Sequence, residues 1–183
     1  NIIDGGNQGS IGDTLDYSTN GATSIVLDLD VTHITDVYGI GVTNDGTYAS
    51  VLVNGNSSAM DKIKNIENIK GSAGADTIYG NADNNTIFGM GGADTIYGVD
   101  GFNYIDGGAG DDTLRGNAGN DTLNGNTGTQ DVADYSHLND AIEIDLRLSE
   151  YQVVNDGSAT KDTLVGIPLI ENHIEPDGHI PDD

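Results

Sequence analysis

Aspartate and asparagine side chains recur every nine residues through the middle of this chain. Each follows a glycine by five residues, and one extra residue precedes the last of them: Asp76, Asn85, Asp94, Asn103, Asp112, Asp121 and Asp131. Their side-chain oxygens are groups that bind hard cations. The same side chains also hydrogen-bond their own backbone in glycine-containing turns, which is enough to explain any single turn of this type. A single residue therefore cannot distinguish a cation site from a simple turn, and the spacing of the whole set has to be considered.

A glycine and an aliphatic residue mark each nine-residue unit. The glycines are Gly71, Gly80, Gly89, Gly98, Gly107, Gly116 and Gly125, and the aliphatic residues seven places later are Ile78, Ile87, Ile96, Ile105, Leu114 and Leu123. An amphipathic helix needs apolar residues at positions i, i+3, i+4 and i+7, which this unit lacks. The unit instead favours a six-residue turn followed by a three-residue strand whose middle side chain points inward. We therefore predict an all-β solenoid with very short strands.

The composition excludes several kinds of partner. The 183 residues include 30 Asp and Glu against 6 Lys and Arg, a formal net charge of -24. This charge excludes a basic footprint for nucleic acid, disfavours anionic membranes and favours a cation as the counter-charge. No stretch approaches the length of an apolar membrane span, so membrane insertion is not expected. The chain has no cysteine, so its stability must come from packing or from metal rather than from disulfides.

The segments on either side of the nine-residue units are also repeated. Four pairs recur: Asp16–Ser18 as Asp134–Ser136, Ile25–Leu29 as Ile142–Leu146, Asn44–Gly46 as Asn155–Gly157, and Ile66–Asn68 as Ile170–Asn172. The spacing between the copies shrinks from 118 to 104 residues, as in a duplicated module with deletions. We therefore predict linking modules over residues 16–70 and, in shortened form, 134–183, with the repeat array over residues 71–133 between them. Residues 1–15 hold a partial repeat, because Ile3 and Gly5 stand where the aliphatic residue and the glycine of a unit belong.

Each linking module is expected to be rich in β-structure. Alternation in Ser24–Asp30 and the aromatic and β-branched residues of Thr47–Val53 predict two strands of a hairpin, with a turn at Asn44–Gly46. The isoleucines of Ile63–Ile69 recur every three residues, which also fits one helical turn. We favour an extended course, because this segment runs directly into the array.

The units resemble the calcium-binding nonapeptide of the RTX (repeats-in-toxin, haemolysin-type) family, G-G-x-G-x-D-x-U-x with U aliphatic. Gly107–Arg115 matches this pattern at every specified position, and the units together cover about a third of the chain. The resemblance implies a right-handed parallel β-roll, a β-solenoid in which two nonapeptides form one 18-residue turn. Loops would then stack on loops two units away, with Ca²⁺ between them.

The resemblance also implies which residues hold the calcium. In the family pattern, carbonyls of positions 1 and 3 and the position-6 carboxylate face carbonyls of positions 2 and 4 and the position-6 carboxylate of the next stacked loop. The implied sites are Gly71, Ala73 and Asp76 with Met90, Gly92 and Asp94; Gly89, Gly91 and Asp94 with Gly108, Gly110 and Asp112; and Gly107, Ala109 and Asp112 with Asn126, Gly128 and Asp131. The insertion before Asp131 makes the third site the least regular.

The loops of the other edge depart from the family pattern. Asn85 and Asn103 would face each other with no position-6 carboxylate, so a cation between them would lack local charge compensation. We expect hydrogen bonds from the Asn side chains there instead. A weaker site is implied one level further along, with ligands Gly98, Asp100 and Asn103 facing Asn117, Gly119 and Asp121. Calcium should therefore be concentrated on the aspartate edge.

Stacking of the aspartates favours the cation over the simple turn. Like charges about 4.8 Å apart on adjacent rungs repel one another unless a cation lies between them. Extracellular calcium modules commonly bind at about 10⁻⁴ to 10⁻³ M. We therefore expect the array to be loose without calcium and to fold when calcium is supplied.

Outward-facing residues of the array would stack at the same 18-residue interval. One such ladder is Tyr79, Tyr97 and Arg115, and another is Thr77, Thr95 and Thr113. The favoured interpretation is that these ladders stabilise neighbouring rungs. The alternative is a small platform that binds carbohydrate through the aromatic rings or ice through the threonines.

Catalytic motifs are weak in this chain. The segment His173–Glu175 is similar to the H-x-E of zinc deaminases, but the partner cysteines are missing. Ser136, His137 and Asp140 lie too close in sequence for a triad. We therefore expect no enzymatic activity.

The resemblance leaves several functions open. The favoured function is a calcium-binding structural segment of a larger secreted bacterial protein, located outside the cell or at its surface, of adhesin or surface-layer type and exported by type I secretion. The alternatives are a non-catalytic accessory module of an extracellular enzyme and a carbohydrate- or ice-binding surface. Incomplete rungs would also favour end-to-end association with like chains or with the rest of a longer protein.

Overall fold

The described part of the chain is built from short β-strands. The computed structural model describes residues 2–6, 12–30, 46–54, 60–138, 143–145, 152–155 and 161–171. The strands are β1 (Ile2–Asp4), β2 (Thr14–Asp16), β3 (Ile25–Asp28), β4 (Ala49–Val53), β5 (Asp61–Lys64), β6 (Asn68–Lys70), β7 (Thr77–Tyr79), β8 (Thr86–Phe88), β9 (Thr95–Tyr97), β10 (Tyr104–Ala109), β11 (Thr113–Arg115), β12 (Thr122–Thr127), β13 (Val132–Asp134), β14 (Glu143–Asp145), β15 (Gln152–Asn155), β16 (Lys161–Val165) and β17 (Leu169–Glu171). These residues include no helix long and apolar enough to cross a membrane.

The nine-residue period produces one strand per unit. In β7, β8, β9 and β11 the middle residue is buried between two partly exposed neighbours. The strands β10 and β12 begin in a similar way and continue into the following loop. The aliphatic residues predicted to point inward are fully buried: Ile78, Ile87, Ile96, Ile105, Leu114 and Leu123. They join apolar residues of the linking modules in one hydrophobic core, and burial of each such side chain is worth about 1.5–3 kcal/mol.

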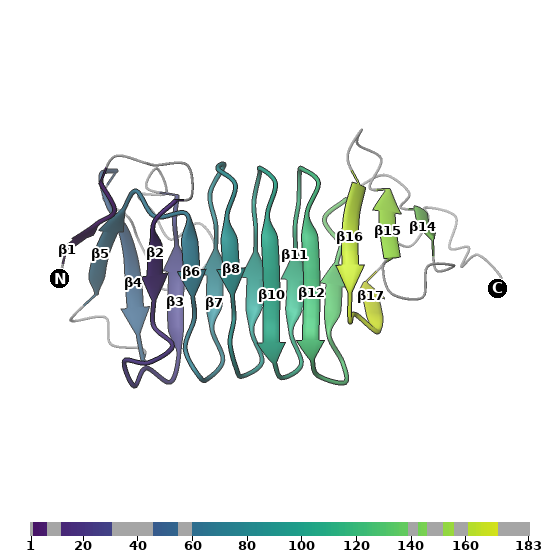
Figure 1. Ribbon diagram of the computed structural model, residues 1–183, viewed down its shortest axis with the longest axis horizontal. Coiled ribbons are helices and arrows are strands. Elements are labelled where there is room, and N and C mark those ends of the chain that lie inside the picture. The colour runs from purple at the N-terminus through teal and green to yellow at the C-terminus, as the bar shows by residue number, and fades with distance from the viewer. Residues whose placement is uncertain are drawn as a thin grey trace.

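Two sheets extend along the long axis of the molecule (Figure 1). The first sheet has the strand order β1-β5-β4-β3-β7-β9-β11-β13-β17, and the second has the order β14-β15-β16-β12-β10-β8-β6-β2. Successive units of the array alternate between the sheets, and each strand pairs in parallel with the strand two units away. Ile78 therefore pairs with Ile96, and Ile87 pairs with Ile105. An all-strand array with parallel sheets is consistent with a β-roll.

The linking modules add antiparallel strands to these sheets. In the first module β4 lies between β3 and β5, and in the second β15 lies between β14 and β16, with every pairing antiparallel. The strands predicted at Ser24–Asp30 and Thr47–Val53 thus pair with each other, whereas residues 31–45, with most of the predicted turn, lie outside the described residues. The segment Ile63–Ile69 follows the extended course of β5 and β6, with no helical turn.

The strand registers align the two modules differently from the repeated sequence triplets. Leu15 and Ala133 each precede an Asp-Tyr-Ser segment. Leu15 pairs with Ile69, and Ala133 pairs with Ile170. By strand pairing, Ile170 is therefore the counterpart of Ile69 rather than of Ile66.

Two positions in the loops of the array have a left-handed backbone. At the second position of a unit, φ is 80° at Met90, 74° at Val99 and 71° at Asn117. At the fourth position, φ is 94° at Gly101, and a Cβ on that residue would lie 2.6 Å from the Asp83 carbonyl oxygen of the stacked loop. Gly101 thus has to be glycine both for its φ and for close stacking, whereas the unit Gly80–Phe88 has Asp83 at its fourth position without a left-handed backbone. The second position tolerates larger residues at a cost in backbone strain.

We predict opposite effects for two substitutions in one loop outside the aspartate edge. Gly101→Ala should lower the free energy of unfolding by about 2 kcal/mol or more, because it combines a left-handed backbone with a steric clash. Val99→Gly should raise it by about 1 kcal/mol or less, because relief of strain is partly offset by the greater freedom of glycine in the unfolded chain. Urea unfolding in saturating calcium measures both. Equal stability of Gly101→Ala and the parent chain would contradict the stacking of these loops.

Candidate metal centre

Four aspartates of the array form one buried column. The aspartate column consists of Asp76, Asp94, Asp112 and Asp131, each at most 3% exposed. The backbone N–H of Asp76 donates to Oδ1 of Asp94 at 2.8 Å, that of Asp94 to Asp112 at 2.8 Å, and that of Asp112 to Asp131 at 3.0 Å. The insertion before Asp131 therefore leaves this residue in line with the others.

The glycine at the first position of each unit makes room for the column. A Cβ on Gly89 would clash with Oδ2 of Asp94, and a Cβ on Gly107 would clash with Oδ2 of Asp112. The carboxylate five residues later lies over the bare Cα of the glycine. The glycine period and the aspartate period are therefore two parts of one structural requirement.

Most of the column carries one carboxylate oxygen without a hydrogen bond. In the described part of the chain, Oδ2 of Asp94, Asp112 and Asp131 is buried and accepts no hydrogen bond, and the same holds for Oδ2 of Asp121 on the other edge. A buried carboxylate oxygen without a donor or a counter-charge is strongly destabilising. This feature fits a cation, because the oxygens that lack a partner are of the type that calcium prefers.

Burial raises the pKa of Asp76, Asp94 and Asp112. Loss of solvation raises the pKa of Asp94 to about 8, and the neighbouring charges of Asp76 and Asp112 add to this effect. Loss of solvation likewise raises the pKa of Asp112 to about 6, with a contribution from Asp131. Without a cation, part of the column is therefore protonated near neutral pH.

The first member of the column is satisfied by the protein itself. Oδ2 of Asp76 accepts from the Ser72 N–H at 2.6 Å, and Oδ1 accepts from the Ser72 hydroxyl at 2.8 Å and from the Ile25 N–H at 2.6 Å. Nothing in the nonapeptide pattern predicted these contacts, since Ile25 comes from the linking module. The carboxylate oxygens of the column that need a counter-charge therefore begin at Asp94.

The position-6 residues of the other edge form a second, mixed column. Asn85 N–H donates to Oδ1 of Asn103 at 2.9 Å, and Asn103 N–H donates to Oδ1 of Asp121 at 2.7 Å. Nδ2 of Asn103 donates to the carbonyl oxygen of Asp100 at 3.1 Å. This carbonyl is one of the ligands predicted for the weaker calcium site, and here it accepts a hydrogen bond from an amide. The asparagines thus hydrogen-bond where the sequence predicted that they would.

The mixed column continues into the second linking module, which the sequence analysis missed. Oδ1 of Asp162 accepts from the Asp121 N–H at 2.9 Å, and Oδ2 accepts from the Tyr135 hydroxyl at 2.6 Å. The segment Asp162–Leu164 reads Asp-Thr-Leu, as do positions 6 to 8 of two nonapeptides. That similarity was the available signal, and Gly157 also stands five residues before Asp162, as the first glycine of a nonapeptide does.

Backbone hydrogen bonds join the stacked loops of the aspartate edge. Gly92 N–H donates to the Ala109 carbonyl at 2.8 Å, and Ala109 N–H donates to the Met90 carbonyl at 3.0 Å. The Thr127 hydroxyl donates to the Gly108 carbonyl at 3.1 Å. Three predicted carbonyl ligands therefore already accept one hydrogen bond, and each retains a second lone pair.

The remaining predicted ligands of this edge lie in the same stacked loops. They are Gly71, Ala73, Gly89, Gly91, Gly92, Gly107, Gly110, Asn126 and Gly128. Within the described residues, no three His, Cys, Asp or Glu side chains converge on one point. A calcium ion here would therefore take carboxylates from the aspartate column and draw its other ligands from backbone carbonyls. The ion would neutralise stacked negative charge, with no catalytic chemistry required.

In the outward-facing ladder, Tyr79, Tyr97 and Arg115 stack on one another. The rings of Tyr79 and Tyr97 stack with centroids 4.5 Å apart and planes 13° from parallel. The Arg115 guanidinium lies 4.9 Å from the centroid of Tyr97, and it is paired with the Asp134 carboxylate of the next rung. Both faces of Tyr97 are thus covered. These contacts support stabilisation between rungs over a flat platform for sugar.

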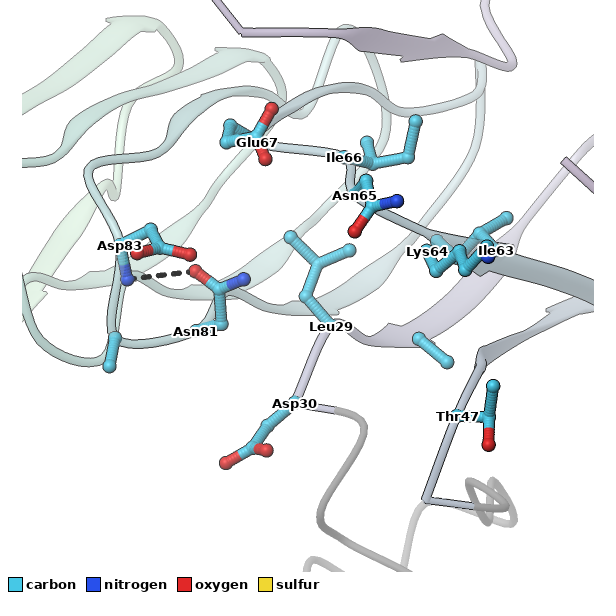
Figure 2. Close-up of a pocket in the computed structure, with 12 residues that line it drawn as sticks. Leu29, Asp30, Thr47, Ile63, Lys64, Asn65, Ile66, Glu67, Asn81 and Asp83 are labelled. Carbon is cyan, nitrogen blue, oxygen red and sulfur yellow. Dashed lines mark hydrogen bonds between the residues drawn. The ribbon is translucent and has the colours of Figure 1, made fainter. Parts of the chain in front are cut away.

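A cavity of about 440 Å³ lies where the first linking module meets the array. Figure 2 shows Leu29 projecting between the loop Asn81–Asp83 and the turn Asn65–Glu67. Asp83 N–H donates to Oδ1 of Asn81 at 2.9 Å within that loop. The loop belongs to the edge of the mixed column, so the cavity is not part of the aspartate column.

We predict opposite responses to acid with and without calcium. The raised pKa values mean that the folded, metal-free array binds more protons than the unfolded chain. The resulting stabilisation is complete below about pH 4 and is lost as the pH rises through about 6 to 8. Calcium needs the ionised carboxylates, so its midpoint concentration should rise as the pH falls from 8 to 6. Thermal unfolding and calcium titrations across this pH range test both, and a calcium midpoint that ignores pH would contradict the site.

Comparison with known proteins agrees with this geometry. The family model of the RTX calcium-binding nonapeptide repeat (4 copies) matches residues 65–96 and again residues 97–129. A search of curated proteins found no match to the chain. The two matched segments contain the strands β7 to β12 and the loops that carry Asp76, Asp94 and Asp112. The array at residues 65–129 therefore belongs to the RTX calcium-binding nonapeptide repeats, and calcium is the ion that these repeats bind.

Proposed function

We propose that the chain is a structural segment of a secreted bacterial RTX protein, of adhesin or surface-layer type, whose array folds into a right-handed β-roll when it meets calcium outside the cell. The observation that carries this proposal is the buried aspartate column with oxygens that accept no hydrogen bond. In the calcium-poor cytoplasm these carboxylates would oppose folding, and the net charge of -24 would add to the repulsion. Such a chain suits type I secretion, in which an unfolded polypeptide passes directly to the exterior.

The size of the calcium effect is comparable with the stability of a small domain. Each site held at tenfold saturation adds about 1.4 kcal/mol to folding, so three sites add about 4 kcal/mol. Native domains are stable by only about 5–15 kcal/mol. Calcium at the concentrations found outside cells can therefore decide whether the array is folded.

A non-catalytic role is part of this proposal. The Ser136 hydroxyl donates to Oδ1 of Asp134 at 2.6 Å, so its proton is held by a carboxylate that also pairs with Arg115. Asp140 and the segment His173–Glu175 lie outside the described residues. A module of this kind could equally serve an extracellular enzyme as a non-catalytic accessory. The covered faces of Tyr97 make the carbohydrate-binding alternative the least supported of the three.

We predict that calcium controls the folding of the array and that the aspartate column carries this control. Far-UV circular dichroism should show a large gain of β-structure when calcium is added to metal-free protein. Asp112→Asn should remove a carboxylate shared by two predicted sites and cost about 3 kcal/mol of calcium-dependent stability. Asp83→Asn, an exposed acid in a loop of the mixed column, is the matched control and should change little.

The reverse substitution provides an independent check. Asn103→Asp places a carboxylate between Asn85 and Asp121, where an amide now donates to the Asp100 carbonyl. The variant should bind at least one more calcium ion than the parent chain in isothermal titration. A spectrum that is unchanged by excess chelator, or equal effects of Asp112→Asn and Asp83→Asn, would refute the proposed role of the column.

A further inference from the structure

Exposed apolar side chains gather around two adjacent strands of the second sheet, β8 and β10. Three of the four large apolar side chains that are exposed in the described residues lie here: Met90, Phe102 and Tyr104, at 42%, 61% and 38%. Met90 follows the end of β8 by two residues, Phe102 precedes β10 by two residues, and Tyr104 begins β10. The chain has only two phenylalanines, and the other, Phe88, is the last residue of β8. Such a concentration is typical of an interaction site.

The outward face of these strands carries two aromatic rings in contact. The middle residue of β8 and the second residue of β10 are buried, so Phe88, Tyr104 and Asp106 point to the opposite, outward face. The register places Phe88 directly opposite Asp106, which makes Tyr104 the diagonal neighbour of Phe88. The centroids of the two rings are 5.9 Å apart and their planes are tilted by 53°. The rings therefore touch without stacking on each other.

Polar side chains continue the same row across the sheet. The register places Lys70, Phe88, Asp106 and Asn124 side by side on the strands β6, β8, β10 and β12 (Figure 1). Nζ of Lys70 lies 3.7 Å from Oδ2 of Asp16, and its side chain is 43% exposed. Because adjacent strands are about 4.8 Å apart, the row is roughly 14 Å long. An aromatic ring thus lies between an ammonium group and a carboxylate, with an amide beyond.

Asp106 holds two asparagine side chains in place beside the rings. Nδ2 of Asn124 donates to Oδ2 of Asp106 at 2.9 Å, and Nδ2 of Asn126 donates to Oδ1 at 3.2 Å. The Tyr104 hydroxyl also donates to Oδ2, at 3.4 Å. An amide nitrogen carries two protons and a carboxylate has about four acceptor positions, so the cluster retains donors and acceptors for a ligand. These groups are oriented before any ligand binds.

The chemistry of the row suits a neutral sugar chain. A pyranose has C–H groups on the faces of its ring, which pack on aromatic side chains, and hydroxyls at its rim, which need donors and acceptors. Lys70 and Asp106 balance each other in charge along the row, and the net charge of -24 disfavours anionic polysaccharides. The strand spacing of about 4.8 Å is close to the length of one pyranose unit. Successive units of a linear glycan can therefore meet successive strands.

We propose that a neutral polysaccharide binds along this row, on the outward face of the second sheet and across β6, β8, β10 and β12. Sugar rings pack on Phe88 and Tyr104, and their hydroxyls bond to Lys70, Asp106 and Asn124. The chain of sugars runs along the long axis of the molecule, because the strands lie across that axis (Figure 1). This binding site is additional to the calcium sites and uses none of their residues as side-chain ligands.

The outward face of the first sheet is built differently. There Tyr97 has Tyr79 on one face and Arg115 on the other, and Arg115 is paired with Asp134. The two rings of the second sheet are tilted rather than stacked, and the polar groups beside them retain donors and acceptors. The covered faces of Tyr97 therefore argue against a sugar platform on the first sheet only.

The site can be tested by isothermal titration of the full chain in calcium with cellohexaose, mannohexaose and chitohexaose. Tyr104→Thr should weaken binding about fivefold through loss of an aromatic contact. This variant should keep the fold, because Thr86 and Thr122 occupy the same position on the neighbouring strands. Asp106→Ala should weaken binding about tenfold or more, since it removes hydrogen bonds to a charged group. Tyr79→Ala, which removes a ring from the first sheet, is the matched control and should bind like the parent chain.

The outcomes separate glycan binding from calcium folding, on which this inference rests. Binding of any of the three hexasaccharides that Tyr104→Thr and Asp106→Ala weaken and Tyr79→Ala does not supports the proposal. A folded chain that binds none of them overturns it, as does binding that ignores Tyr104→Thr and Asp106→Ala. Self-association that depends on Tyr104 in sedimentation velocity, without glycan binding, assigns the face to a second copy and also overturns it. A circular dichroism spectrum that is unchanged by calcium would instead overturn the proposed function.

Discussion

The repulsion between stacked, buried carboxylates is the constraint on which the rest of this structure depends. Asp94, Asp112 and Asp131 are each at most 2% exposed and keep one oxygen that accepts no hydrogen bond. Burial raises the pKa of Asp94 to about 8, which shows how strongly the protein interior disfavours the charged form. Protons or a cation can compensate this charge, and calcium is the ion that RTX repeats bind.

The two columns meet this constraint in different ways. The aspartate column begins at Asp76, whose carboxylate accepts hydrogen bonds from Ser72 and from Ile25 of the first linking module. The mixed column ends at Asp162 of the second module, whose second oxygen accepts the Tyr135 hydroxyl. Between these ends, Asn85 and Asn103 replace aspartate on the mixed edge and supply their own donors, whereas Asp121 keeps a buried Oδ2 that accepts no hydrogen bond. The linking modules therefore supply hydrogen-bond donors at one end of each column, and the carboxylate oxygens without donors lie between Asp94 and Asp131 and at Asp121.

The local repeat could be predicted from sequence far better than its boundaries. The glycine and aliphatic periods fix short strands with Ile78 and its counterparts buried, because turn geometry and core packing both act within nine residues. The hydrogen bond from Ile25 to Asp76 could not be predicted, because it joins residues 51 positions apart in the sequence. Asp162, in contrast, carried a local signal, because Gly157 and the Asp-Thr-Leu segment repeat the nonapeptide spacing. The matched triplet aligns Ile170 with Ile66, whereas the strand pairing aligns it with Ile69, because the pairing partner of Ile170 lies 37 residues away in the sequence at Ala133. The left-handed backbone at Met90 was also hidden, because family glycines at that position are replaced here by larger residues.

The most direct measurement is a crystal structure of the chain grown in calcium, with ions located by their anomalous scattering. The account predicts calcium next to the Oδ2 atoms of Asp94, Asp112 and Asp131, with fewer ions or none between Asn85 and Asn103. Ions distributed equally over both edges, or an aspartate column with no ion beside it, would contradict the central claim that calcium compensates the buried carboxylates.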